Sequence, residues 1–214
     1  MNLRELNLKL TKESLKKEIG RDILIIQTIH TIDELIKIVN TLVANLRERY
    51  GYYAPRASKI ESQEKLLEQI NKKIKEDIGL DFTKKDLDSI TELADEIKKL
   101  DELEKSQEKY LEELTNEICP NLSKVATALI ASRLIDRAGS LKHLAELPSS
   151  TIQVLGAEKA LFRHIKTGAK APKFGIIFTH PNITKALSEE RGKVARKISS
   201  EISKAAKIDF FRPK

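Results

Sequence analysis

The feature that most constrains the fold is a run of branched apolar residues that recurs in alternating steps of four and three. The run comprises Ile25, Ile29, Ile32, Ile36, Val39, Val43 and Leu46. This spacing is the apolar seam of three heptads, which turns one face of an α-helix toward a partner helix. A helix over residues 25–46 would be roughly 33 Å long. We expect it to end between Arg49 and Pro55, where Gly51 and Pro55 interrupt the pattern.

A second helical arm follows this seam. Residues 66–78 carry Leu66, Leu67, Ile70, Ile74 and Ile78 and predict one helix before a turn at Gly79. A further seam then continues to Ile118, with one step of three where a step of four is due, which would overwind a coiled coil locally. Its members are Ile90, Leu93, Ile97, Leu100, Leu103, Gln107, Tyr110, Leu114 and Ile118.

Two heptad arms separated by a turn predict an antiparallel coiled coil. Arms as long and polar as these bury little area alone and gain more by packing on a second copy. We therefore expect a homodimer, and its predicted interface residues are Ile32, Ile36, Val39, Val43, Ile90, Leu93, Ile97 and Leu100.

The charge of the chain is concentrated at one end. The net charge is +7, but residues 156–214 contain 14 Lys and Arg against 5 Asp and Glu, which gives +9. Residues 1–155 carry 25 bases and 27 acids, which gives −2. A basic segment of this kind is typical of nucleic-acid binding, whereas charge that served solubility alone would more often be spread out.

Composition excludes several classes of protein. The single cysteine, Cys119, rules out an internal disulfide and favours a reducing compartment. The longest apolar runs are too short for a membrane span, and the first residues lack a secretory apolar core. No pair of His residues has metal-ligand spacing, and no nucleotide-binding loop or acid–base pair appears. We therefore expect no enzyme activity, no cofactor, no metal and no membrane.

The last third of the chain mixes small residues with bases. Residues 156–165 predict a helix with Lys159 and Arg163 on one face and Ala160, Leu161 and Ile165 facing inward. Taken alone, this pattern fits a backbone that approaches RNA phosphates and fits an ordinary solvated helix equally well. Residues 174–178 fit either a strand or a buried loop. A final helix is expected after Ser188, with an apolar stripe at Val194, Ile198 and Ile202.

These residues resemble the signature of the Nop domain, a ribonucleoprotein-binding module. The resemblance is collinear over the last third of the chain. It rests on Ser132–Gly139, Leu147–Gln153, Gly156–Arg163, His180-Pro181, Arg191–Arg196 and Lys207–Phe210. The preceding helices resemble the coiled coil of the archaeal box C/D scaffold family. The resemblance implies an all-α chain, with a helical region and coiled-coil stalk over residues 1–120 and a compact helical Nop domain over residues 121–214.

The resemblance also implies a function. The chain would be a non-catalytic scaffold that binds a box C/D guide RNA for 2′-O-methylation in the archaeal cytoplasm. It would recognise a kink-turn together with the ribosomal-protein-like partner already bound there. In the family, fibrillarin docks on an N-terminal domain. We expect this sequence to begin after that domain, and we therefore expect no binding of fibrillarin. The implied RNA-binding residues are Gly156, Ala157, Glu158, Lys159, Arg163, Lys166, Thr167, Lys170, Lys173, His180, Arg191, Lys193 and Arg196.

Three alternatives remain at this stage. His180 is placed against a nucleotide by the resemblance, but its position before Pro181 also fits a turn residue. The whole chain could be a coiled-coil adaptor whose basic end binds acidic proteins. A spliceosomal Nop-domain protein shares the signature, although the form Gly-Ala-Glu-Lys-Ala-Leu-Phe from Gly156 and the Lys-rich final helix fit the box C/D branch better.

Overall fold

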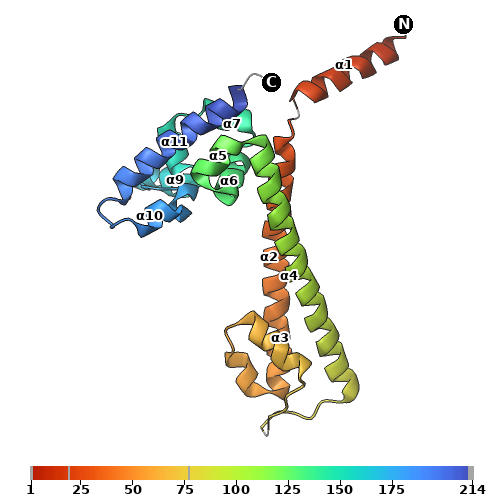
Figure 1. Ribbon diagram of the computed structural model, residues 1–214. Helices are drawn as coiled ribbons and strands as arrows, with labels where there is room; N and C mark the ends of the chain where they lie inside the picture. Colours follow the sequence, from red (N-terminus) through yellow and green to blue (C-terminus); the bar gives the residue numbers. More distant parts are fainter. Residues whose placement is uncertain (1, 19, 77, 212–214) are drawn as a thin grey trace. The chain divides into compact units, whose positions relative to one another are not determined.

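The computed structural model describes residues 2–18, 20–76 and 78–211, and within them every regular element is a helix (Figure 1). This confirms the predicted all-α class. No helix in this part of the chain is both long and apolar enough to cross a membrane. The elements are α1 (Leu3–Glu18), α2 (Asp22–Tyr53), η1 (Pro55–Lys59), α3 (Gln63–Asn71), α4 (Lys84–Ile118), α5 (Pro120–Ala126), α6 (Ala128–Ala138), α7 (Leu141–Glu146), α8 (Ser149–Val154), α9 (Glu158–Thr167), η2 (Ile176–Thr179), α10 (Pro181–Lys185) and α11 (Arg191–Phe211).

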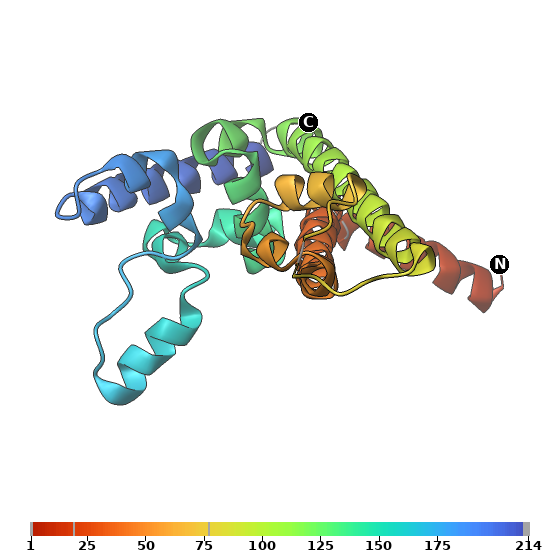
Figure 2. The same cartoon turned by 90° about the horizontal axis from the view of Figure 1, so that it is seen from below.

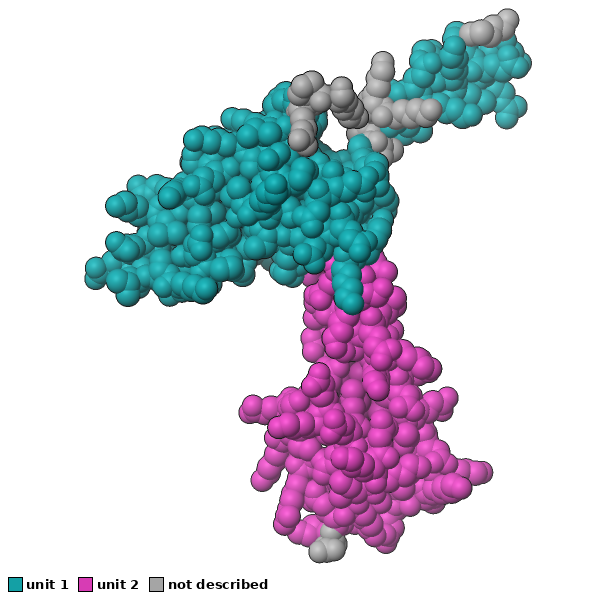
Figure 3. Space-filling model, in the orientation of Figure 1, with its two compact units in different colours: residues 1–30, 109–214 teal, residues 31–108 magenta. Residues whose placement is uncertain are grey.

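The chain divides into two compact units, residues 31–108 and residues 1–30 with 109–214 (Figure 3). The predicted boundary at residue 120 does not coincide with this division, because the ends of both long helices pack with the C-terminal helices. Asp22 accepts a hydrogen bond from the backbone N–H of Leu141 at 2.7 Å. Arg21, just before α2, forms an ion pair with Glu117 near the end of α4.

The unit of residues 31–108 is an antiparallel helical hairpin braced by α3. One apolar cluster joins the second half of α2 to the first half of α4, so the two helices run in opposite directions there. The cluster includes Val39, Val43, Leu46, Tyr50, Leu66, Leu67, Ile70, Ile90, Ala94 and Ile97. Within it the Tyr50 hydroxyl donates to the carbonyl of Ile74 at 2.8 Å. The heptad seam of residues 25–46 is buried or half-buried at every position, as predicted.

Helix α2 continues through Gly51 and ends at Tyr53, inside the predicted range between Arg49 and Pro55, because a single glycine costs only about 1 kcal/mol in a helix that packing supports. Two other details of these helices differ from the prediction. Helix α3 ends at Asn71 instead of residue 78. On α4, Leu103 and Tyr110 are exposed, and the inward stripe runs from Ile97 through half-buried Asp101, Glu104 and Gln107 to buried Leu111. The predicted seam is therefore wrong at Leu103 and Tyr110, and the local overwinding stays a prediction.

Helix α11 is the centre of the C-terminal helices. It packs against α5, α7 and α8. Its buried face carries the predicted Ile198 and Ile202 together with small residues, and the small side chains allow neighbouring helices to approach closely. At its end Asp209 accepts hydrogen bonds from the backbone N–H groups of Asn121 and Leu122 at 3.2 and 2.8 Å. The Asp209 carboxylate therefore holds the end of α11 against the start of α5.

Candidate nucleic-acid interface

The signature begins with a tight turn at Gly156. Its φ is +91°, and a Cβ atom at this position would lie 2.6 Å from Cγ1 of Ile176. Nearby, the backbone N–H groups of Gly175 and Ile176 donate to the carbonyls of Gln153 and Leu155 at 2.9 and 2.8 Å. The space that a glycine leaves is therefore filled by the chain itself. Gly156 itself is exposed, so its predicted place at the RNA stays a prediction.

Glu158, the first residue of α9, is committed to contacts within the chain. Its carboxylate accepts two hydrogen bonds from Arg137 of α6, at 3.1 Å from Nε and 2.6 Å from a terminal nitrogen. It also accepts from the backbone N–H of Gly156 at 2.8 Å. The hydrogen bond from Arg137 is the main cause that lowers the pKa of Glu158 to about 2. Glu158 therefore anchors α9 to α6, and its role at RNA stays a prediction.

Helix α9 and the loop after it extend away from the other C-terminal helices (Figure 2). None of the residues of this helix, which we call the α9 arm (residues 158–167), is buried. Phe162 is 61% and Ile165 69% exposed. The expectation that Ile165 faces inward is wrong, because Ile165 lies on a face of α9 that is open to solvent. Ala157 and Leu161 are half-buried, and the predicted bases Lys159, Arg163 and Lys166 are all exposed.

Three predicted bases meet beyond the arm. Lys170, Lys173 and Arg191 line a hollow of about 360 Å³ together with Ala171, Phe174 and Ser188. We call this the basic hollow. The Arg191 guanidinium donates to the carbonyl of Ala186 at 3.1 Å and lies 5.9 Å from the ring centre of Phe178. Phe174 and Phe178 stack at 5.5 Å. Sequence reasoning did not select either Phe, although their four-residue spacing beside a base was a usable signal.

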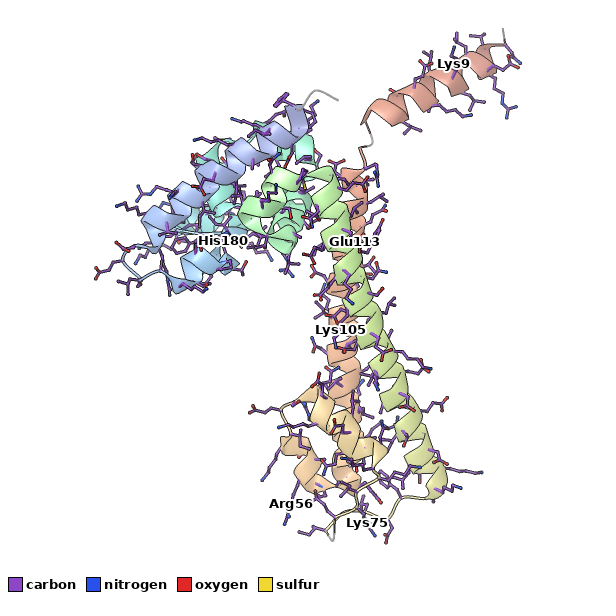
Figure 4. The ribbon with its side chains drawn as sticks, viewed as in Figure 1. Lys9, Arg56, Lys75, Lys105, Glu113 and His180 are labelled. Atoms are coloured by element: carbon purple, nitrogen blue, oxygen red, sulfur yellow. The ribbon has the colours of Figure 1, made fainter. Side chains whose placement is uncertain are left out.

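His180 lies inside the fold (Figure 4). Its side chain is only 6% exposed. Nε2 lies 2.9 Å from the carbonyl of Val125, and Nδ1 accepts the backbone N–H of Asn182 at 3.2 Å, which caps α10. Both ring nitrogens are thus used within the chain. The placement against a nucleotide is not supported, and the alternative of a turn residue before Pro181 describes the position correctly.

Comparison with known proteins identifies the family. The family model Nop, described as "snoRNA binding domain, fibrillarin", matches residues 25–214. The chain belongs to the Nop family. A NOP5 family protein of Methanocaldococcus jannaschii is 36% identical over 94% of this chain. Nucleolar protein 58 of Schizosaccharomyces pombe is 34% identical over 90%, and human nucleolar protein 56 is 33% identical over 89%.

A solved structure is also similar to this Nop chain. The structure titled as a fibrillarin/NOP5P complex superposes with a TM-score of 0.61, at 28% identity, over 98% of this chain and 70% of the other. The sequence relatives are longer. The chain spans 56% of the Methanocaldococcus protein, 43% of the yeast protein and 37% of the human protein.

The remaining predicted RNA-binding residues of this Nop chain lie on two helices. Lys193 and Arg196 are exposed on α11, where Arg196 Nε donates to the carbonyl of Gly192 at 3.2 Å. The Thr167 hydroxyl donates to the carbonyl of Arg163 at 2.8 Å and so closes the end of the α9 arm. No group of His, Cys, Asp and Glu side chains in the described part of the chain could hold a metal ion.

The residues predicted to pair two Nop chains are used within one chain. Val39, Val43, Ile90 and Ile97 belong to the apolar cluster of residues 31–108, and Leu93 and Leu100 pack against it. Ile32 is also buried, and Ile36 is half-buried. Most of these side chains therefore pack within one chain. The homodimer and its interface residues stay predictions, and Ile36, Leu93 and Leu100 are only half-buried within the chain.

Proposed function

We propose that this Nop chain is a non-catalytic RNA-binding component of a box C/D ribonucleoprotein, and that it recognises a kink-turn RNA together with the protein already bound there. The family supports the coarser part of this proposal. One observation supports the finer part. The α9 arm exposes Phe162 and Ile165 on the same helix as Lys159, Arg163 and Lys166.

This mixture of side chains fits a composite partner. Bases that contact phosphates supply affinity without sequence information, and that affinity falls as salt rises. Exposed large apolar residues gain nothing from a phosphate backbone, and they more often mark contacts with protein. A surface that carries both kinds of side chain suits a junction where RNA and protein are presented together.

A gel shift with a kink-turn RNA tests the proposal. The wild-type chain should bind the naked RNA weakly and the RNA with its primary ribosomal-protein-like binder much more tightly. Phe162→Ser with Ile165→Ser should remove the gain that the primary binder provides and leave weak binding to naked RNA unchanged. Both residues are exposed, so the variant should keep the helicity of the wild type by circular dichroism.

A second variant separates charge from apolar contact. Lys159→Gln with Lys166→Gln should weaken binding to both RNA forms and flatten the dependence of log K on log salt by about one unit per lost contact. An adaptor that binds acidic proteins would instead shift neither RNA. Equal binding of the naked and protein-bound RNA would also contradict the proposal, because the apolar face would then have no role.

A further inference from the structure

The basic hollow differs in kind from the α9 arm, because an aromatic ring lies in a concave site among three cations. We infer that the hollow binds a single unpaired nucleotide of the RNA, with its phosphate at Lys170, Lys173 and Arg191 and its base against Phe174. This inference rests on the proposed RNA-binding function and names one part of the RNA that the chain would hold.

The first argument is uncompensated charge. Arg191 is held in place by two neutral acceptors, the carbonyls of Ala186 and Thr184, at 3.1 and 3.4 Å. Among the described residues, no carboxylate forms an ion pair with Lys170, Lys173 or Arg191. Glu189 and Glu190 precede Arg191 in the chain, but neither lines the hollow. An oriented guanidinium beside two ammonium groups is therefore a ready site for a phosphate.

The second argument is the aromatic ring. Phe174 lines the hollow, and its ring stacks on Phe178 with an interplanar angle of 27°. The Arg191 guanidinium lies over that same Phe178 ring. The stacked pair of Phe174 and Phe178 therefore links the position of the Arg191 guanidinium to the position of the Phe174 ring. A site for phosphate alone needs no aromatic wall, whereas single-stranded RNA sites combine a cationic groove with aromatic rings on which bases stack.

The third argument is size. A hollow of about 360 Å³ is at the small end of the range of pockets that hold small ligands. It offers room for one nucleotide and not for a duplex, whose stacked bases could not reach Phe174. A base that stacks there has to be unpaired, as bases are in loops and bulges.

The experiment compares two short RNAs that carry the same number of phosphates. One is an oligouridine, and the other is the same oligomer with abasic sites in place of the uridines. Fluorescence anisotropy with the full chain measures both affinities over a range of salt concentrations. The wild type should bind oligouridine about tenfold more tightly than the abasic oligomer, because base–aromatic stacking contributes on that scale.

Two classes of variant separate base from phosphate. Phe174→Leu should abolish the preference for oligouridine and leave the affinity for the abasic oligomer unchanged, whereas Phe174→Tyr should keep the preference. Lys170→Gln or Arg191→Gln should weaken both oligomers and reduce the salt slope by about 0.7 each, the value for a single strand. Phe211→Leu is the matched control, because Phe211 is exposed at the end of α11 and lies outside the hollow.

Two outcomes would overturn the inference, and they differ from failure of the proposed function. Equal affinity of the wild type for both oligomers would mean that no base is held. A preference that survives Phe174→Leu would place the base elsewhere. In either case the kink-turn gel shift would still occur. If the wild type gave no gel shift with any RNA, the proposed function itself would fail.

Discussion

The guanidinium of Arg137 holds both carboxylate oxygens of Glu158 at 3.1 and 2.6 Å, and so joins the end of α6 to the first residue of the α9 arm. No residue of the arm is buried. This ion pair, with the hydrogen bond from the Gly156 backbone, is therefore a main constraint on the direction of the arm.

The first prediction concerns pH. Glu158→Gln should cost about 1 kcal/mol of stability at pH 7, because a partly exposed, doubly hydrogen-bonded pair is lost. The folded pKa of Glu158 is about 2, below its ordinary 4.5, so the contribution is complete above pH 4.5 and is lost as pH falls toward 2. Urea denaturation of both proteins across this range measures it. If the difference in free energy of unfolding between the wild type and Glu158→Gln stayed constant down to pH 2, the lowered pKa of Glu158 would be contradicted.

The second prediction concerns the turn at Gly156. Gly156→Ala should destabilise the fold by about 2–3 kcal/mol, because it adds a clash with Ile176 to an unfavourable positive φ. Gly168→Ala is the matched control. It has a positive φ of 68° but nothing within 4 Å of the added Cβ, so it should cost only about 1 kcal/mol. Thermal unfolding of both variants measures the difference, and equal losses would show that the clash with Ile176 is unimportant.

The third prediction concerns His180. Its replacement by Ala should destabilise the chain by about 2 kcal/mol, because the cap of α10 is lost and the carbonyl of Val125 loses its partner. RNA affinity, measured at a temperature where the variant is fully folded, should not change. His143→Ala is the control, since its ring is exposed and its loss should cost little. A specific loss of RNA affinity at unchanged stability would restore a direct role for the His180 imidazole.

The fourth prediction concerns the seam. Ile32→Glu with Val39→Glu should unfold the hairpin of residues 31–108, because charges would enter its own apolar interior at a cost of several kcal/mol. Ile38→Glu, at a position that is 49% exposed, should leave helicity unchanged. Circular dichroism distinguishes the two, and light scattering on the wild type tests the proposed homodimer. If the double variant kept full helicity and lost a dimer that the wild type forms, the seam would lie at the interface between two copies and not inside the hairpin.

The sequence alone determined the elements that depend on local pattern and on charge. A heptad period is a property of consecutive residues, so the seam of residues 25–46 could be predicted directly, whereas the all-α class followed from the resemblance to the Nop domain. The concentration of bases after residue 156 is likewise visible without coordinates. The signature residues resembled the Nop domain closely enough to indicate the family, but the resemblance did not establish the role of each residue.

Only the tertiary structure decided which of those residues face solvent. From the sequence, a glycine at position 156 fits close contact with RNA and close contact with another part of the chain equally well. The structure shows that Ile176 lies against the position of the missing Cβ. His180 and Glu158 form hydrogen bonds within the fold, with Val125 and Arg137. These partners are distant in sequence, so the contacts could not be predicted from local spacing. The meeting of Lys170, Lys173 and Arg191 around Phe174 has the same origin. Contacts of this kind arise when separate helices and loops pack together, and no local spacing encodes them.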